Sequence, residues 1–149
     1  MNIHYSTLGG FFVFLTTKQA KYLDKHIEYM CKQFSVERTV KPGRGHAKVR
    51  KRTIQHPPIG IDEMAYFVAL HELGHVVIGM HAHRLDREAL AWEWALRQSL
   101  IEPHYSIRQR ICSLLVRYLY RGKENNWEFP KEDSPFWQLF RWWEVEDGT

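Results

Sequence analysis

The chain has 149 residues, 44% of them apolar and 26% charged, which suits one globular domain spanning 1–149 with a sizeable core. No apolar run reaches the ~18 residues that a membrane span requires, so no membrane association is expected. Cys31 and Cys112 lack C-x-x-C spacing, so the sequence indicates neither a cysteine zinc site nor a disulfide framework. We therefore expect a soluble protein of a reducing compartment, the cytoplasm.

The net charge of +4 is spread unevenly along the chain. No acidic residue lies between Glu37 and Asp62, whereas the segment from Glu124 onward is mainly acidic. The basic residues of the first interval are Arg38, Lys41, Arg44, Lys48, Arg50, Lys51 and Arg52. This basic segment suggests an acidic or DNA-associated partner.

The N-terminal part of the chain predicts a strand followed by an amphipathic helix. The apolar stretch GGFFVFLTT has neither the basic flank nor the cleavage motif of a signal peptide, so we interpret Phe11–Leu15 as a buried strand. Thr16 and Gln19 have the spacing of a capping box, and apolar residues then recur at helical spacing to about Val36.

The basic segment 38–58 predicts a hairpin or an edge strand. It contains the turn sequence PGRG, then alternates apolar and basic residues, and ends at a double proline. Such a strand can bind substrate backbone as an added strand, or it can be a solvated edge that basic side chains protect from aggregation. Contact with nucleic-acid phosphates, helped by Arg110, Arg117 and Arg121, is a third and less favoured alternative.

Residues 62–80 predict a helix that is apolar almost all round and therefore buried. This helix contains the motif HELGH, in which His71 and His75 lie one turn apart and can both reach one ion. If they were only hydrogen-bonded core histidines, three polar side chains on a buried helix would lack an evident partner. We therefore predict that His71 and His75 bind Zn²⁺ and that Glu72 accepts a proton from the attacking water.

Two further helices are expected, over residues 86–100, ended by Pro103, and over 105–121, ended by Gly122. Helical spacing places Ile107, Ile111, Leu114, Leu115 and Tyr118 in the core.

A short aromatic helix is expected after Ser134. Its residues Phe136, Trp137, Phe140 and Trp143 share one face, which caps the core or, alternatively, docks a partner.

A catalytic zinc site usually has three protein ligands, so the motif requires a third. His81 lies where metzincins have their third histidine, but the glycine of that pattern is displaced to Gly79 and no methionine follows Met80. Asp86 fits better as the cap of the following helix. Glu88 is left as the third ligand.

The residues that follow Glu88 favour this assignment. Ala91 and Ala95 share its helical face, and their small side chains would let this helix approach the motif helix closely. Glu93 is rotated by about 140° and is expected to face solvent. Gly74, between the two histidines, is expected to permit close backbone contact with a neighbouring element.

The segment VALHELGHVVIG and the later E-x-x-A-x-x-[FW]-A pattern, present from Glu88 to Ala95, resemble the ImmA/IrrE-like small zinc metallopeptidases. Many members of this family are encoded by phages and mobile elements. The resemblance covers about Ala47 to Pro103. It implies a minimal zincin fold of gluzincin type, with His71, His75 and Glu88 as ligands and Glu72 as general base. It also implies a protein substrate, such as a transcriptional regulator.

The sequence as a whole predicts an α+β fold, mainly helical, with a small β-sheet or hairpin beside the active-site helix. We expect a zinc metallopeptidase that cuts a protein or peptide substrate, with His81 or His83 favoured over His104 and Tyr105 as oxyanion donor. The alternative is a non-catalytic, zinc-stabilised phage-type protein that binds a host protein or nucleic acid. The oligomeric state is left open.

Overall fold

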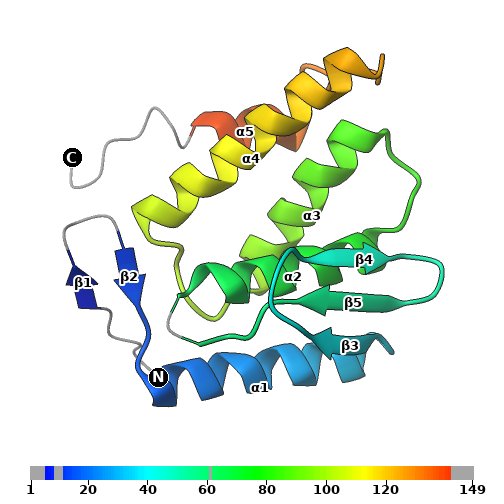
Figure 1. Cartoon of the computed structure of the whole chain (residues 1–149). Coiled ribbons are helices and arrows are strands. Elements are labelled where there is room, and N and C mark those ends of the chain that lie inside the picture. Colours follow the sequence, from blue (N-terminus) through cyan, green and yellow to red (C-terminus); the bar gives the residue numbers. More distant parts are fainter. Residues whose placement is uncertain (1–5, 9–11, 61, 142–149) are drawn as a thin grey trace.

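The computed structural model describes residues 6–8, 12–60 and 62–141 (Figure 1). Within these ranges the helix α2 lies at the centre, in contact with α1, with α3 and with two strands of a small sheet (Figure 1). The α+β prediction is confirmed, with a small sheet beside the helix that contains HELGH. The helices are α1 (Thr17–Gln33), α2 (Met64–Ile78), α3 (Arg84–Gln98), α4 (Tyr105–Glu124) and α5 (Pro135–Phe140). The strands are β1 (Ser6–Leu8), β2 (Phe12–Phe14), β3 (Glu37–Val40), β4 (His46–Lys48) and β5 (Thr53–His56).

Strands β1 and β2 form an antiparallel pair ahead of α1. The strand expected over Phe11–Leu15 corresponds to β2, and Phe11 itself lies outside the described residues. Leu15 is buried, and Phe14 forms an isolated antiparallel bridge with Asp62. The N-terminal pair is thereby joined to the segment that leads into α2.

Helix α1 begins as predicted, with the capping box formed. The Thr16 hydroxyl accepts from the backbone N–H of Gln19, and the Gln19 side chain accepts from the backbone N–H of Thr16. The helix ends before Val36, because Ser35 has a left-handed backbone with a φ of 54°. Its buried residues are Ala20, Leu23, Ile27, Met30 and Cys31.

The three-stranded sheet has the order β3-β5-β4. Strands β4 and β5 are antiparallel, with Ala47 opposite Ile54, so the predicted hairpin is present. Strand β3 runs parallel to β5 and was not predicted, because most of its residues are exposed and show no apolar alternation. Strand β4 is therefore an edge strand, and it lies against α2.

Helix α2 is buried almost all round, as its composition predicts. All of residues 64–74 except Val68 are buried. The helix begins after Asp62, whose side chain accepts from the backbone N–H of Met64 at 2.9 Å. It ends at Gly79, which has a φ of 80°. Within the described residues, no helix combines the length and the apolar content needed to cross a membrane.

Glu63, at the start of α2, is a fully buried carboxyl group. Burial raises its pKa from the ordinary 4.5 to about 7, although the backbone N–H of His104 donates to it at 3.2 Å. Its other oxygen has no hydrogen-bond partner among the described residues. The folded state thus holds this proton more tightly than the unfolded state does.

Because the folded state favours the protonated carboxyl, the stability that Glu63 contributes is fully present below about pH 4.5. It is lost as pH rises through about 7, where the buried carboxyl must ionise. We expect Glu63→Gln to change stability little at pH 5 and to raise it by about 2–3 kcal/mol at pH 8. Urea unfolding of both proteins across this pH range measures the difference. A gain that does not grow with pH would contradict the prediction.

Two predicted helix boundaries are wrong. Asp86 is not the cap of α3, which is His83; it lies in the first turn and accepts from the hydroxyl of Ser134. Gly122 does not end α4, because it lies inside the helix, where a Cβ would meet a methyl carbon of Leu85 at 3.0 Å. The glycine therefore serves close packing of α4 on α3.

The short helix α5 covers the end of the core. The Ser134 hydroxyl accepts from the backbone N–H of Phe136, whose side chain is fully buried. Trp137 and Phe140 pack against the core from the same helix, and Trp143 lies outside the described residues. The predicted capping role is thus confirmed for the described part of the aromatic face.

Candidate metal centre

The structure brings the three predicted metal ligands together between α2 and α3. The Nε2 atoms of His71 and His75 are 3.1 Å apart. Glu88 reaches both rings from α3, with its Oε2 at 3.0 Å from the His71 Nε2 and its Oε1 at 3.2 Å from the His75 Nε2. Among the described residues this is the group of ligand-type side chains that could hold a metal ion.

The spacing of the three ligand atoms fits a tetrahedral ion. With metal–ligand bonds of about 2.0–2.1 Å, two ligands of a tetrahedral zinc lie about 3.3 Å apart. The three separations here, 3.0, 3.1 and 3.2 Å, are close to that value. If both Nε2 atoms carried protons, two N–H groups would be crowded together at a nitrogen separation of only 3.1 Å. One cation, by contrast, can bind all three ligand atoms.

Charge within the group supports a cation. Burial alone would raise the pKa of Glu88, but hydrogen bonds from both imidazoles and their positive charge outweigh it, so its pKa lies below the ordinary range. Burial lowers the pKa of His71. At His75, burial also opposes protonation, but the hydrogen bond and the negative charge of Glu88 raise the pKa. The Glu88 carboxylate therefore favours positive charge at the position that its two histidine contacts define.

Glu88 reaches the histidines because α2 and α3 cross very closely. Ala91 and Ala95 are fully buried on the face of α3 that also presents Glu88. A Cβ on Gly74 would lie only 2.8 Å from the carbonyl oxygen of Ala91. The packing role predicted for Gly74 is therefore confirmed.

We expect Gly74→Ala to destabilise the fold by about 1–3 kcal/mol, because backbone of α3 must move away from α2. The same movement would draw Glu88 from the histidines and weaken metal binding. Denaturant unfolding and zinc titration measure the two effects. Gly60→Ala is a matched control, since a Cβ there meets nothing within 4 Å; equal effects of both substitutions would contradict the prediction.

Trp92 orients the first ligand and was missed from the sequence. Its ring stacks on that of His71, with centroids 4.0 Å apart and planes 19° apart. The Nδ1 of His71 is buried and has no hydrogen-bond partner among the described residues, so the imidazole is oriented by stacking on Trp92 and by the contact of its Nε2 with Glu88. Trp92 lies one turn after Glu88, and this spacing could have indicated its position.

A scan of family models, a search of the curated proteins and a search of the solved structures give no match to this chain.

The predicted base, Glu72, lies on the wall of a cavity next to the ligands. Its side chain is largely buried, and it lines a cavity of about 660 Å³ together with His71 and Trp92. Burial and the negative charge of Glu88 raise the pKa of Glu72 to about 7, against the lowering effect of His75 and Arg44. A carboxyl with this pKa can accept and release a proton near neutral pH.

The other sequence candidates lie outside the ligand group. His81 and His83 are exposed, and His83 pairs with Glu128 at 2.8 Å. His104 caps α4, where its Nδ1 accepts from the backbone N–H of Ser106. Glu93, expected to face solvent, is partly exposed and pairs with Arg97 on α3.

Tyr118 was predicted only as a core residue, but its hydroxyl is a polar group near the candidate site. It packs against the core, but it also lines the cavity that contains Glu72. Burial, with the negative charges of Glu88 and Glu72, raises its pKa to about 12, so its hydroxyl remains a donor at neutral pH. The guanidinium of Arg121 lies 5.9 Å from the centre of its ring. Helical periodicity cannot distinguish such a position from a fully buried one.

Proposed function

We propose that this chain is a zinc-dependent metallopeptidase that hydrolyses a peptide bond in a protein substrate. The observation that carries the proposal is the buried group His71, His75 and Glu88 with the carboxylate of Glu72 beside it on a cavity wall. Two imidazoles, one carboxylate and an open side match the ligand set of a catalytic zinc site. The resemblance to ImmA/IrrE-like peptidases leads to the same residues.

Zinc, when bound, supplies Lewis acidity that acidifies a water and polarises a carbonyl. His71, His75 and Glu88 would hold it, and Glu72 accepts the proton of the attacking water and returns it to the leaving amine. Tyr118 donates to the carbonyl oxygen as negative charge develops there. Both cysteines are buried and not joined in a disulfide, which suits a reducing compartment, so we place the substrate in the cytoplasm.

The direct test is metal-dependent proteolysis. Zinc-loaded protein is incubated with a peptide library and with cytoplasmic extract, and new peptide ends are identified by mass spectrometry. We expect cuts that disappear when a chelator removes the metal and return with added zinc. Stoichiometric zinc without any metal-dependent cut would favour the alternative, a non-catalytic zinc-stabilised binding protein.

Tyr118→Phe tests the proposed donor. We expect kcat to fall about 10²-fold or more with little change in KM, because the hydroxyl acts mainly on charge that develops in the transition state. The zinc content should equal that of the wild type, since Tyr118 is not part of the ligand group. Tyr120→Phe is a control, because Tyr120 is exposed. An unchanged kcat in Tyr118→Phe would remove Tyr118 from the mechanism.

A further inference from the structure

A groove crosses the candidate site on both sides of Glu72. One cavity of about 660 Å³ lies toward α4, and a second of about 820 Å³ lies toward the β4–β5 hairpin and α3. Both are lined by Arg44, Gly45, Glu72, Tyr118 and Arg121. A chain lying along this groove would therefore pass over the base and the metal ligands.

The edge strand β4 forms one wall of the groove. Residues 46–49 line the second cavity, which His75 and Glu88 also line. One side of β4 pairs with β5, and the other side has no strand partner among the described residues. At the start of this strand a Cβ on Gly45 would meet Val68 at 2.6 Å and Glu72 at 3.1 Å, so the free edge begins directly beside the base.

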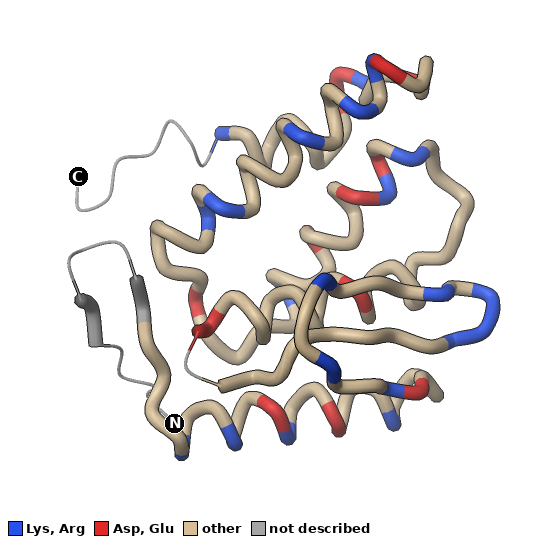
Figure 2. The backbone as a smooth tube through the Cα atoms, in the orientation of Figure 1, with Lys and Arg blue, Asp and Glu red and all other residues tan. Residues whose placement is uncertain are grey.

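The groove is strongly basic. Its hairpin side contributes Lys48, Arg50 and Lys51, and Figure 2 shows basic residues at the end of the β4–β5 hairpin. The helices contribute Arg84, Arg87 and Arg121. Within the part of the chain that the structure describes, none of these six side chains forms an ion pair. The carboxylates that face them, Glu72 and Glu88, belong to the catalytic group.

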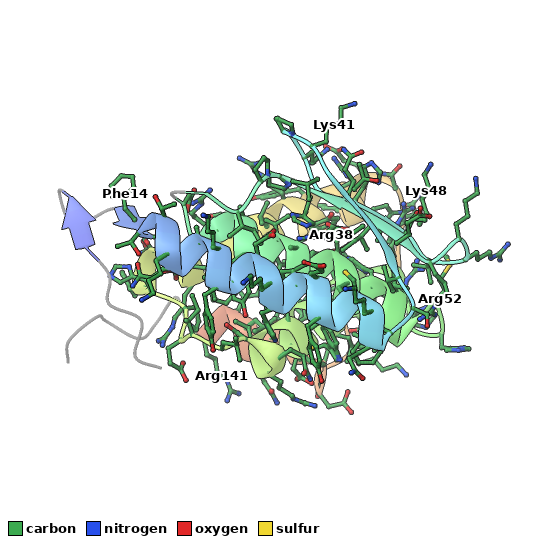
Figure 3. The ribbon with its side chains drawn as sticks, turned by 90° about the horizontal axis from the view of Figure 1, so that it is seen from below. Phe14, Arg38, Lys41, Lys48, Arg52 and Arg141 are labelled. Atoms are coloured by element: carbon green, nitrogen blue, oxygen red, sulfur yellow. The ribbon has the colours of Figure 1, made fainter. Side chains whose placement is uncertain are left out.

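Two other basic residues of the interval 38–52, Arg38 and Arg52, contact α1 or its C-terminal end instead. Arg38 lies against α1, where it pairs with Asp24 at 2.7 Å (Figure 3). Arg52 donates to the carbonyl groups of Phe34 and Ser35 at the end of α1. Lys48, Arg50 and Lys51 form no such ion pair among the described residues, so their charge is available to a ligand.

We propose that this groove binds acidic peptide segments in extended conformation, as a strand added to the free edge of β4. The inference rests on the proposed peptidase function and names its substrate class. The edge supplies backbone donors and acceptors at strand spacing, and the basic walls supply charge complementarity. A nucleic acid would use the charge, but it has no peptide backbone to pair with the strand edge.

The test uses two labelled peptides with the same apolar centre, one flanked by Asp and Glu and the other by Gln. Binding to zinc-loaded Glu72→Gln protein is followed by fluorescence anisotropy, and cleavage by wild-type protein is followed by kcat/KM. We expect about tenfold preference for the acidic peptide in both measurements, reduced by added salt. The double substitution Lys48→Glu with Arg50→Glu should abolish the preference without loss of zinc.

The control is Lys18→Glu with Lys25→Glu, which changes the net charge equally at exposed positions of α1 outside the groove. Equal binding of the two peptides, or an equal effect of the control, would overturn the inference. Tighter binding of an oligonucleotide, lost with Lys48→Glu and Arg50→Glu, would overturn it in favour of nucleic acid. Selective binding of the acidic peptide without cleavage would support the groove and reject the peptidase.

Discussion

Substituting Glu72 by glutamine should reduce peptide hydrolysis by about 10²–10⁴-fold and leave the zinc content unchanged. The amide of glutamine has nearly the shape of the carboxylate, so it fits beside Gly45 and Val68, where space is very tight. It cannot accept the proton of the attacking water. The ligand group His71, His75 and Glu88 remains complete, and metal analysis of the purified variant checks this directly.

Glu93→Gln is the matched control for this prediction. Glu93 is a carboxylate of α3 that pairs with Arg97 and lies outside the ligand group. Its substitution should leave kcat/KM within about twofold of the wild type. Full activity of Glu72→Gln would mean that another group takes the proton, and the assignment of Glu72 as base would be wrong.

The parts of the site that the sequence predicts are those that depend on periodicity within one helix. His71 and His75 share a face because they are four residues apart, and the apolar residues around them require a buried helix. The position of Glu88 followed from Ala91 and Ala95, since a stripe of small side chains indicates close packing of two helices. The structure confirms that contact at Gly74 and Ala91.

The parts that the sequence does not predict depend on how separate elements meet. Strand β3 has mostly exposed residues, and it is a strand because β5 supplies its hydrogen bonds. Tyr118 fits an apolar stripe, and only the position of α4 shows that it lines the same cavity as Glu72. Asp86 has the residue type of a cap, but its partner is Ser134 on a segment far along the chain.

Removing the carboxylate of Glu88 should strongly weaken zinc binding and the stabilisation that zinc gives to the fold. In Glu88→Gln the ion would lose its anionic ligand, and we expect affinity to fall by more than the ~10–100-fold that loss of an outer-shell partner causes. Because zinc bound to the folded state stabilises it by mass action, the zinc-dependent rise in Tm should largely disappear. Zinc titration and thermal unfolding with and without zinc measure both effects.

His81→Ala and Asp86→Ala test the alternatives for the third ligand. Both residues lie outside the ligand group, so these variants should bind zinc as tightly as the wild type. In Asp86→Ala a moderate loss of stability is expected, because the hydroxyl of Ser134 loses its acceptor. That loss should be the same with and without zinc, whereas the loss in Glu88→Gln should depend on zinc. Wild-type zinc affinity in Glu88→Gln, with weakened binding in His81→Ala, would move the third ligand to His81.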